Sequence, residues 1–380
     1  MRIPYNKQMQ IKFHKPYITE KEINNVVATL KSGWLGMGPK TKEFEQKFQK
    51  TIGANHAIFL NSGTAALDLA LQAIGIKAGD EVIIPTNTYI ATAEVVAYSN
   101  AIPILCDIKK TTHNMDPAKL ENLITKKTKA IIPVHFGGQS CNMDEIMHIG
   151  KKHNLKIIED ASHALPATYK NKTIGTIGDI TCFSFYTSKT LCTAEGGMAV
   201  TNNKDYAEKI RIKRLHGLNR DAWERYQGQK SWYYEAIDIG RKYNPTDINA
   251  SLGLAQLQKL DWMHKRRQEI AEKYTSELSP TSLALPFIDP NRKTSWYLYV
   301  LKSDNRDHLM EKLHQAGIET SVHFLPVHKH KYYKNKFGYN NEDFPVANSV
   351  FEKSLSLPIY PGLQEDETDY IIQKLKKHTC

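Results

Sequence analysis

The sequence predicts an α/β protein with one large, mostly parallel sheet and a smaller α/β lobe near the C-terminus. From about residue 56 to residue 214, short apolar runs alternate with longer amphipathic runs, a pattern typical of a parallel sheet covered by helices. Prolines and polar residues over 279–291 then mark a boundary, after which strand-like and helix-like segments alternate again over a shorter stretch.

Seven runs fit strands of the large sheet. Each is apolar over most of its length and short enough to be a buried strand rather than a helix. In chain order they are His56–Leu60, Glu81–Pro85, Ile104–Asp107, Ala130–His135, Lys156–Glu159, Thr181–Phe185 and Met198–Thr201. We expect all seven in one sheet.

Helices are expected before, between and after these strands. Thr19 and Glu22 have the spacing of a capping box, which predicts a helix that begins there and runs through Leu30. Apolar residues recur at helical spacing in four further segments. These are Ala65–Ile74, Met143–His153, Asn202–Leu215 and the long amphipathic stretch Asp247–Leu278.

The C-terminal part predicts a smaller α/β lobe. Its expected elements are a strand over Trp296–Leu301, a helix over Arg306–Gly317, a strand over Thr320–His323 and a last helix from Glu365. The sequence therefore predicts two domains. Residues 1–250 form the large one with an N-terminal arm, and residues 251–380 form a linking helix and the small lobe.

Composition excludes several classes of protein. Of the 380 residues, 41% are hydrophobic, 24% are charged and 16 are prolines, which is ordinary for a globular chain and excludes disorder and a collagen-like protein. No apolar run approaches the ~20 residues that a membrane helix needs. Polar residues occur throughout the first 20 residues and leave no apolar core, so no secretory signal is expected. We expect a cytoplasmic protein that does not bind a membrane.

The cysteines fit the same compartment. They are odd in number, scattered and free of any C-x-x-C pair, which indicates reduced thiols rather than a disulfide framework or a zinc site. The five are Cys106, Cys141, Cys182, Cys192 and Cys380.

The chain is basic, with 51 Lys and Arg against 40 Asp and Glu and a formal net charge of +11. Three interpretations are open: a solvated basic surface, nucleic-acid binding, or steering of a small anionic substrate such as a nucleotide diphosphate. The longest basic block is Lys265–Arg267, and no nucleic-acid module is recognisable, so no nucleic-acid partner is expected.

A phosphate site is suggested where the segment Leu60–Ala66 (LNSGTAA) leaves a predicted strand and begins a helix. A helix start presents unpaired N–H groups and the positive end of the helix dipole to an anion. Ser62, Gly63 and Thr64 would supply hydroxyls and a close approach. A glycine at such a turn can equally serve only the backbone geometry, so this motif leaves phosphate binding open.

Asp160 stands at the carboxyl end of a predicted strand in Ile157–His163 (IIEDASH), the edge at which open α/β sheets bind ligands. An isolated aspartate there can instead cap the next turn. His163, three residues later, can equally be an ordinary core histidine.

Lys189 carries the strongest signal, within Cys182–Gly197 (CFSFYTSKTLCTAEGG). Most lysines lie on the solvated surface, but this one follows a strand end at Ser184 and has small, polar and aromatic neighbours. A lysine that forms a Schiff base must be partly desolvated to be nucleophilic. The surroundings of Lys189 favour that role.

Six segments occur in one order: NSGTAAL, PTNTYIATAEV, VHFGGQ, IIEDASHA, SFYTSKTLCTAEGG and YNPTDINASLGLAQL. Together they resemble the DegT/DnrJ/EryC1/StrS family of pyridoxal-phosphate (PLP) sugar aminotransferases, from about residue 12 to residue 376. The resemblance implies the aspartate-aminotransferase type of fold (PLP fold type I), with a large seven-stranded domain and a small C-terminal one. It also implies a homodimer with active sites at the interface.

The resemblance gives each candidate residue a role. Lys189 would bind PLP covalently and, when released, would move a proton between the cofactor and the substrate carbon. Asp160 would pair with the pyridinium nitrogen and keep it protonated. His163 would lie near the phenolic oxygen of the ring, and Tyr89 would stack on its face. The phosphate would be held by Ser62, Gly63, Thr64 and Ser184, with Asn244 reaching in from the partner subunit.

Three histidines in Glu319–His330 invite a zinc interpretation. Their spacings of five and two residues fit no common metal motif, so no metal site is expected. In the family this segment approaches the sugar nucleotide, which makes His323 and His328 predicted substrate contacts.

The implied activity has two half-reactions. L-Glutamate would convert PLP to pyridoxamine phosphate (PMP), and a nucleotide-linked keto sugar would then accept the amine. The segments Arg211–Trp223 and Lys242–Leu257 are most similar to the branch of the family that acts at C4. The C3 branch usually has Arg-Leu-Asp where this chain has Pro245–Asp247. The product would be an amino sugar for a surface polysaccharide or lipopolysaccharide.

Four alternatives are kept beside this interpretation. The first is an aminotransferase that acts at C3. A 3-dehydratase of the same family is disfavoured because it replaces the Schiff-base lysine with histidine. A non-catalytic, cofactor-binding regulator and a basic RNA-binding protein are the other two.

Overall fold

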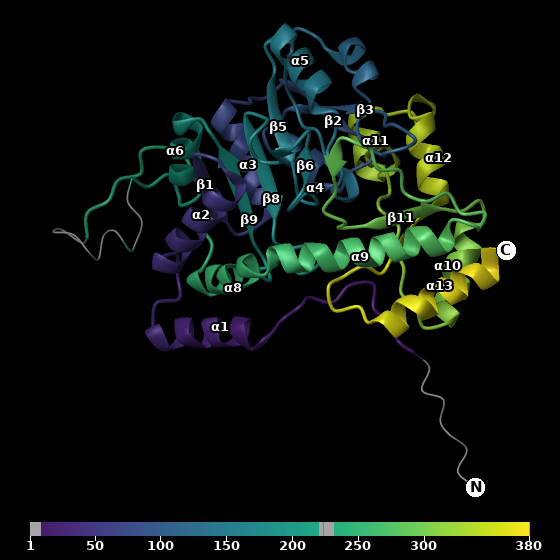
Figure 1. Ribbon diagram of the computed structural model, residues 1–380. Helices are drawn as coiled ribbons and strands as arrows, with labels where there is room; N and C mark the ends of the chain where they lie inside the picture. The colour runs from purple at the N-terminus through teal and green to yellow at the C-terminus, as the bar shows by residue number, and fades with distance from the viewer. Residues whose placement is uncertain (1–8, 220–222, 224–231, 380) are drawn as a thin grey trace.

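The computed structural model describes residues 9–219, 223 and 232–379 (Figure 1). Its large sheet has seven strands in the order β1-β9-β8-β5-β4-β2-β3. Only β9 runs antiparallel to its neighbours, β1 and β8. The predicted seven-stranded, mostly parallel sheet is confirmed. The bounds are β1 His56–Leu60, β2 Glu81–Pro85, β3 Ile102–Cys106, β4 Thr128–Ile131, β5 Lys156–Asp160, β8 Ile180–Ser184 and β9 Gly197–Thr201.

The strand predicted over Ala130–His135 is too long, because β4 ends at Ile131. Pro133 has no N–H to donate to the ladder, and a 3-10 helix begins at Phe136. The turn carries the chain away from the sheet at the edge where the candidate site lies.

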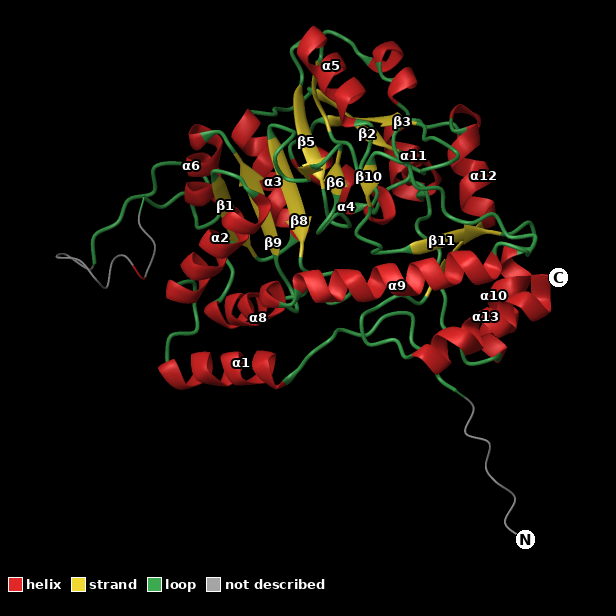
Figure 2. Cartoon of the chain, viewed as in Figure 1, coloured by secondary structure: helices red, strands yellow, loops and turns green. Residues whose placement is uncertain are grey.

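Helices cover both faces of the sheet (Figure 2). One face packs against α2 (Pro39–Ile52), α5 (Met143–His153) and α8 (Asp247–Gln258). The other packs against α3 (Gly63–Ile74), α4 (Ala91–Tyr98), α6 (Lys204–Lys213), α11 (Lys331–Phe337) and α12 (Pro345–Lys353). The helices α2, α4, α11 and α12 were not predicted. Each face therefore has its own apolar core.

The N-terminal helix α1 (Glu20–Ser32) confirms the predicted capping box, because Thr19 N–H donates to Glu22 Oε2 at 2.8 Å. The stretch predicted as one helix over Asp247–Leu278 is two. It breaks at Lys259, and the second part is α9 (Leu260–Leu278). Figure 1 shows α9 running from α8 to the small lobe. The helix thus joins the two parts of the fold.

The small lobe holds a separate apolar core between α9, α10 (Arg306–Gln315), α13 (Glu365–Thr379) and a two-stranded sheet. This sheet pairs β11 (Tyr299–Lys302) with β12 (Ser354–Leu357). The prediction of a strand over Thr320–His323 was wrong. Only Ser321 forms an isolated bridge, to Ser356, and the rest of that segment turns toward the large sheet. A further small sheet combines β6 (Thr168–Tyr169), β7 (Lys172–Thr173) and β10 (Arg292–Lys293).

Within the described residues, no helix is both long enough and apolar enough to cross a bilayer. Four of the five cysteines, Cys106, Cys141, Cys182 and Cys192, are buried and free. Cys380 lies outside the described residues.

Candidate active site

The loops that follow β1, β2, β5 and β8 meet at one edge of the large sheet, where a cavity of about 480 Å³ opens. Parallel strands bring their carboxyl ends to the same edge, which explains why residues so far apart in the chain converge here. Of the predicted site residues, the cavity is lined by Ser62, Gly63, Thr64, Tyr89, Asp160, His163, Ser184, Lys189 and His323. Asn244 and His328 are not among the lining residues.

The N-terminus of α3 forms one wall. Ser62 is its N-cap residue, and its hydroxyl accepts a hydrogen bond from Ala65 N–H at 3.0 Å. A Cβ on Gly63 would lie 2.8 Å from Cβ of Ser184, so only glycine lets the helix start approach the end of β8 this closely. Thr64 and Ser184 add hydroxyls. The wall therefore offers backbone N–H groups, a positive helix end and hydroxyls to an anion.

The carboxylate of Asp160 is buried opposite, at 5% exposure. Its Oδ2 accepts a hydrogen bond from Thr92 Oγ1 at 2.9 Å, and its Oδ1 accepts one from Ser162 N–H at 3.1 Å. Thr92 in turn contacts the hydroxyl of Thr88 at 2.8 Å. These donors fix the orientation of the buried carboxylate.

The imidazole of His163 is also buried, and its Nδ1 accepts a hydrogen bond from Gly137 N–H at 3.3 Å. Burial, reinforced by the charge of Lys189, lowers the pKa of His163 well below its usual value. The ring is therefore neutral, with its proton on Nε2. Such a histidine can donate a hydrogen bond into the cavity without adding a charge.

The amine of Lys189 points at a residue that the sequence did not single out. Its Nζ lies 3.4 Å from the hydroxyl of Tyr297 and 4.4 Å from the centre of the Tyr297 ring. That hydroxyl is also 3.0 Å from Ser188 Oγ. The lysine thus sits between large-sheet loops and a segment just ahead of β11.

Two aromatic residues extend the cavity outward. Tyr89 lines it with 61% of its surface exposed, and its ring centre lies 5.8 Å from that of Phe324. The Phe324 ring in turn stacks on His163 at 5.8 Å. A planar ligand could lie between these rings and the buried groups.

The two histidines predicted as substrate contacts occupy different places. His323 lines the cavity, and its Nδ1 lies 2.8 Å from Ser356 Oγ, while burial lowers its pKa to about 3. His328 is buried away from the cavity. Its ring nitrogens contact Thr86 Oγ1 at 2.6 Å and Asn348 Oδ1 at 3.0 Å, so it ties the segment after β2 to α12. These bonds give His328 a structural role, and its predicted substrate contact stays a prediction.

In the part of the chain that the structure describes, no three His, Cys, Asp or Glu side chains come together as metal ligands would. His330, the third histidine of the segment, lies 3.2 Å from the carbonyl of Leu325 through its Nε2.

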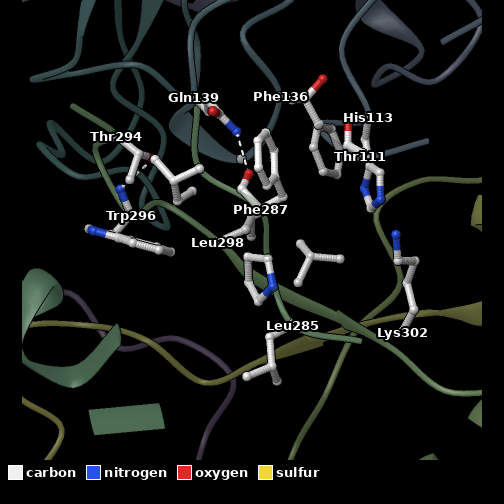
Figure 3. A pocket seen from close by; sticks show the side chains of 15 residues that line it. Thr111, His113, Phe136, Gln139, Leu285, Phe287, Thr294, Trp296, Leu298 and Lys302 are labelled. Atoms are coloured by element: carbon white, nitrogen blue, oxygen red, sulfur yellow. Dashed lines mark hydrogen bonds between the residues drawn. The ribbon is translucent and has the colours of Figure 1, made fainter. Parts of the chain in front are cut away.

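A second cavity adjoins Phe136 and is much smaller, about 40 Å³ (Figure 3). Aromatic and aliphatic side chains form most of its wall, with His113 and Lys302 on one side, and Gln139 Nε2 donates across it to the carbonyl of Phe287 at 3.0 Å. That volume suits one or a few water molecules. This second cavity is too small for a cofactor or a sugar, whereas the first has room for one.

The residues of Pro245–Asp247 serve the fold. Thr246 caps α8 by accepting from Asn249 N–H at 3.2 Å. Asp247 is 1% exposed and accepts hydrogen bonds from the backbone of Gly38, Lys40 and Thr41 at 2.9–3.0 Å, at the start of α2. Asp247 therefore connects the start of α8 to the start of α2.

Thr92 and Tyr297 were missed by the sequence analysis. Thr92 lies in PTNTYIATAEV, a segment in which the sequence analysis selected only Tyr89. Its hydroxyl stands at the start of α4, and this position could have identified it as a candidate site residue. Tyr297 lies inside the strand predicted over Trp296–Leu301, and the sequence analysis assigned it no role. The strand begins only at Tyr299, because Trp296 has a φ of 52° that interrupts the extended backbone.

Comparison with known proteins explains this set of side chains. The model of the DegT/DnrJ/EryC1/StrS aminotransferase family matches residues 16–376. The spore coat polysaccharide biosynthesis protein SpsC of Bacillus subtilis is 46% identical over 369 residues, which cover 95% of each protein.

Solved structures agree over almost the whole chain. Spr1654 of Streptococcus pneumoniae in its PMP form superposes with a TM-score of 0.92 at 36% identity, covering 97% of this chain and 98% of that one. The same protein in its PLP form gives 0.91 at 35% identity. PseC of Helicobacter pylori, an aminotransferase involved in the biosynthesis of pseudoaminic acid, gives 0.91 at 28% identity, covering 98% and 99%.

The cavity fits PLP in the chemistry of its donors. A helix N-terminus with hydroxyls suits the phosphate, a buried carboxylate suits the pyridine nitrogen, and a lysine suits the aldehyde carbon. The family, the fold and the cofactor predicted from the sequence are confirmed. This chain is a PLP-dependent sugar aminotransferase, and it belongs to the DegT/DnrJ/EryC1/StrS aminotransferase family.

Proposed function

We propose that the chain transfers an amino group from L-glutamate to the C4 keto group of a nucleotide-linked keto-deoxy sugar. The observation that carries this proposal is the convergence of Lys189, Asp160 and the α3 N-terminus on one cavity. The product serves a surface polysaccharide or lipopolysaccharide, a role supported by the 46% identity to SpsC. The four free, buried cysteines suit a reaction that takes place in the cytoplasm.

Each residue has a defined task in this reaction. The α3 N-terminus, with Thr64 and Ser184, would hold the phosphate of PLP. Asp160 would hold a proton at the pyridine nitrogen, and Lys189 would take and return a proton at the substrate carbon. When bound, PLP would supply the electron sink for the C–H bond that breaks. His163 would offer its Nε2–H to the ring oxygen, and Tyr89 would cover the ring face.

The basic character of the chain supports an anionic substrate. The net charge of +11 favours a glutamate and a sugar diphosphate over neutral substrates. We assign His323, in the cavity wall, to the sugar nucleotide.

The regiochemistry rests on sequence similarity to the C4 branch in Arg211–Trp223 and Lys242–Leu257. Residues 220–222 of the first segment lie outside the described residues. In the second, Asp247 contacts α2, so the C4 assignment depends on the overall likeness of the segment rather than on a substrate contact. The C3 aminotransferase is the alternative.

A substrate panel tests donor, acceptor and regiochemistry together. UDP-, dTDP-, GDP- and CDP-linked 4-keto and 3-keto sugars are incubated with the PLP-loaded protein and L-glutamate, and products are identified by mass spectrometry and NMR. We expect an amine on C4 of one 4-keto substrate. Turnover of 3-keto isomers alone would establish the alternative. PLP binding without turnover of any donor would indicate a regulator.

We further propose a homodimer in which Asn244 serves the cavity of the partner. This is supported by its position outside the cavity of its own chain and by the environment of its amide. The Nδ2 contacts Pro245 O at 3.3 Å, whereas the buried Oδ1 accepts no hydrogen bond within the described residues. We expect sedimentation to give a dimer and Asn244→Ala to weaken PLP binding about 10- to 150-fold, since one hydrogen bond to a charged group contributes ~1.5–3 kcal/mol.

Mixed dimers give the decisive measurement. Lys189→Ala and Asn244→Ala subunits are unfolded and refolded together, with PLP below the level that saturates Asn244→Ala. A dimer with one subunit of each kind has one site with both residues intact if Asn244 acts across the interface. Random pairing then restores about one quarter of the wild-type activity. No recovery above the separate variants would place Asn244 in its own subunit's site.

A further inference from the structure

Tyr297 is held in place by an unusual backbone just ahead of β11. Its neighbour Trp296 has a φ of 52°, in the left-handed region that bulky residues avoid. Ser295 Oγ accepts a hydrogen bond from Tyr297 N–H at 3.2 Å and donates one to the carbonyl of His163. Strain of this kind persists only when its surroundings enforce it, and it gathers at functional sites.

The loop on the large sheet is shaped to receive this segment. Ser295 N–H donates to the carbonyl of Gly138 at 3.1 Å, and Leu298 N–H donates to that of Gly137 at 3.2 Å. A Cβ on Gly138 would lie 2.0 Å from Ser295 Oγ, so this close approach requires glycine. The position of the Tyr297 ring is therefore set by both parts of the fold.

The ring of Tyr297 lies against the catalytic groups. It is 8% exposed, and its centre lies 4.3 Å from that of the His163 ring. Among the described residues, its hydroxyl is the one hydrogen-bond partner of Lys189 Nζ, at 3.4 Å. Ser188 Oγ holds the same hydroxyl at 3.0 Å from the other side.

We propose that Tyr297 is a positioning residue that holds the free amine of Lys189 toward the reacting carbon through its hydroxyl and ring face. When the Tyr297 hydroxyl donates its hydrogen to Ser188 Oγ, its oxygen can accept a hydrogen bond from the Lys189 amine. The face of the Tyr297 ring makes a further cation–π contact with the same amine. A lysine side chain has four rotatable bonds, and proton transfer requires its nitrogen within hydrogen-bond distance of the carbon. This inference rests on the proposed role of Lys189 in proton transfer.

Tyr297→Phe tests the hydroxyl while keeping the ring. Two measurements are made: the rate at which the cofactor-free protein captures PLP at Lys189, with loss of water, and the single-turnover rate with the amino donor. We expect both rates to fall about 10- to 100-fold, since a displacement of ~1 Å costs that much. The deuterium isotope effect for the donor α-hydrogen should rise, because proton transfer becomes the slow step.

The controls separate positioning from folding. Tyr299→Phe makes the same change two residues along, at a hydroxyl that contacts Thr275 Oγ1 at 3.0 Å in the small-lobe core, and should leave both rates unchanged. Ser188→Ala should lower the rates less than Tyr297→Phe, and the double variant should lose no more than Tyr297→Phe alone, because Ser188 acts through the hydroxyl.

Wild-type capture and isotope effects in Tyr297→Phe would overturn the inference. A slower turnover with an unchanged isotope effect would do the same, since it would reduce Tyr297 to a structural residue. The PLP capture rate needs neither donor nor acceptor. It therefore tests Tyr297 even if the proposed substrates prove wrong.

Discussion

Replacement of Lys189 by alanine is expected to remove both the covalent attachment of PLP and all measurable transamination. The amine of Lys189 faces the cavity between Ser188 and Tyr297, and no second lysine lines that cavity within the described residues. The substitution removes both the nucleophile that binds PLP and the general acid and base. Loss of the general acid and base by itself lowers the rate ~10²–10⁴-fold. Absorbance in the visible range and borohydride reduction followed by peptide mass spectrometry give the readout.

Lys172→Ala is the matched control, because Lys172 is exposed on β7 away from the cavity. It should retain the reducible bond and full turnover. A borohydride-reducible bond in Lys189→Ala, at any residue of the cavity, would show that another group carries the cofactor.

Asp160→Asn should reduce turnover about 100-fold or more while PLP remains bound. The asparagine oxygen can still accept from Ser162 N–H, and its amide N–H can donate to the Thr92 hydroxyl when that hydroxyl donates to Thr88, so the local structure is kept. The negative charge that holds the proton at the pyridine nitrogen is lost, and the electron sink weakens. Stopped-flow measurement of the half-reaction with the amino donor gives the rate, and equilibrium dialysis gives the PLP affinity.

The pH dependence of the activity distinguishes loss of the Asp160 charge from a folding defect, because only the former predicts a specific direction of change with pH. Without the carboxylate, protonation of the ring nitrogen requires a lower pH, so the ratio of Asp160→Asn activity to wild-type activity should rise as the pH falls. Thr92→Val removes one of the two hydrogen bonds to Asp160 and should give a smaller loss in the same direction. Near-normal rates in Asp160→Asn at every pH would contradict the role of this carboxylate.

The sequence determined the large sheet and the central chemistry, because both depend on local patterns. A buried parallel strand is a short apolar run, and seven such runs gave seven strands. The residues at the ends of these runs lie on one edge by geometry, which is why Ser62, Asp160 and Ser184 line a single cavity. The capping box at Thr19 is likewise complete within four residues.

Contacts between segments far apart in the chain decided the rest. The second strand of the small lobe, β12, is a short run whose partner β11 lies more than 50 residues earlier, and no local pattern distinguishes it from Thr320–His323. His328 and His323 share one histidine-rich segment, yet one binds Thr86 and Asn348 and the other enters the cavity.

Tyr297 shows the same limit at the active site. Its neighbours in sequence resemble core strand residues, and its contact with Lys189 spans more than 100 residues. That contact depends on the strained turn at Trp296 and on glycines in another loop. Neither feature produces a periodic pattern of apolar residues in the sequence. The sequence by itself therefore determined the sheet, the cofactor and the candidate reactive lysine. Only the tertiary structure decided that Tyr297 is the hydrogen-bond partner of that lysine, because contacts between distant segments are set by packing rather than by local spacing.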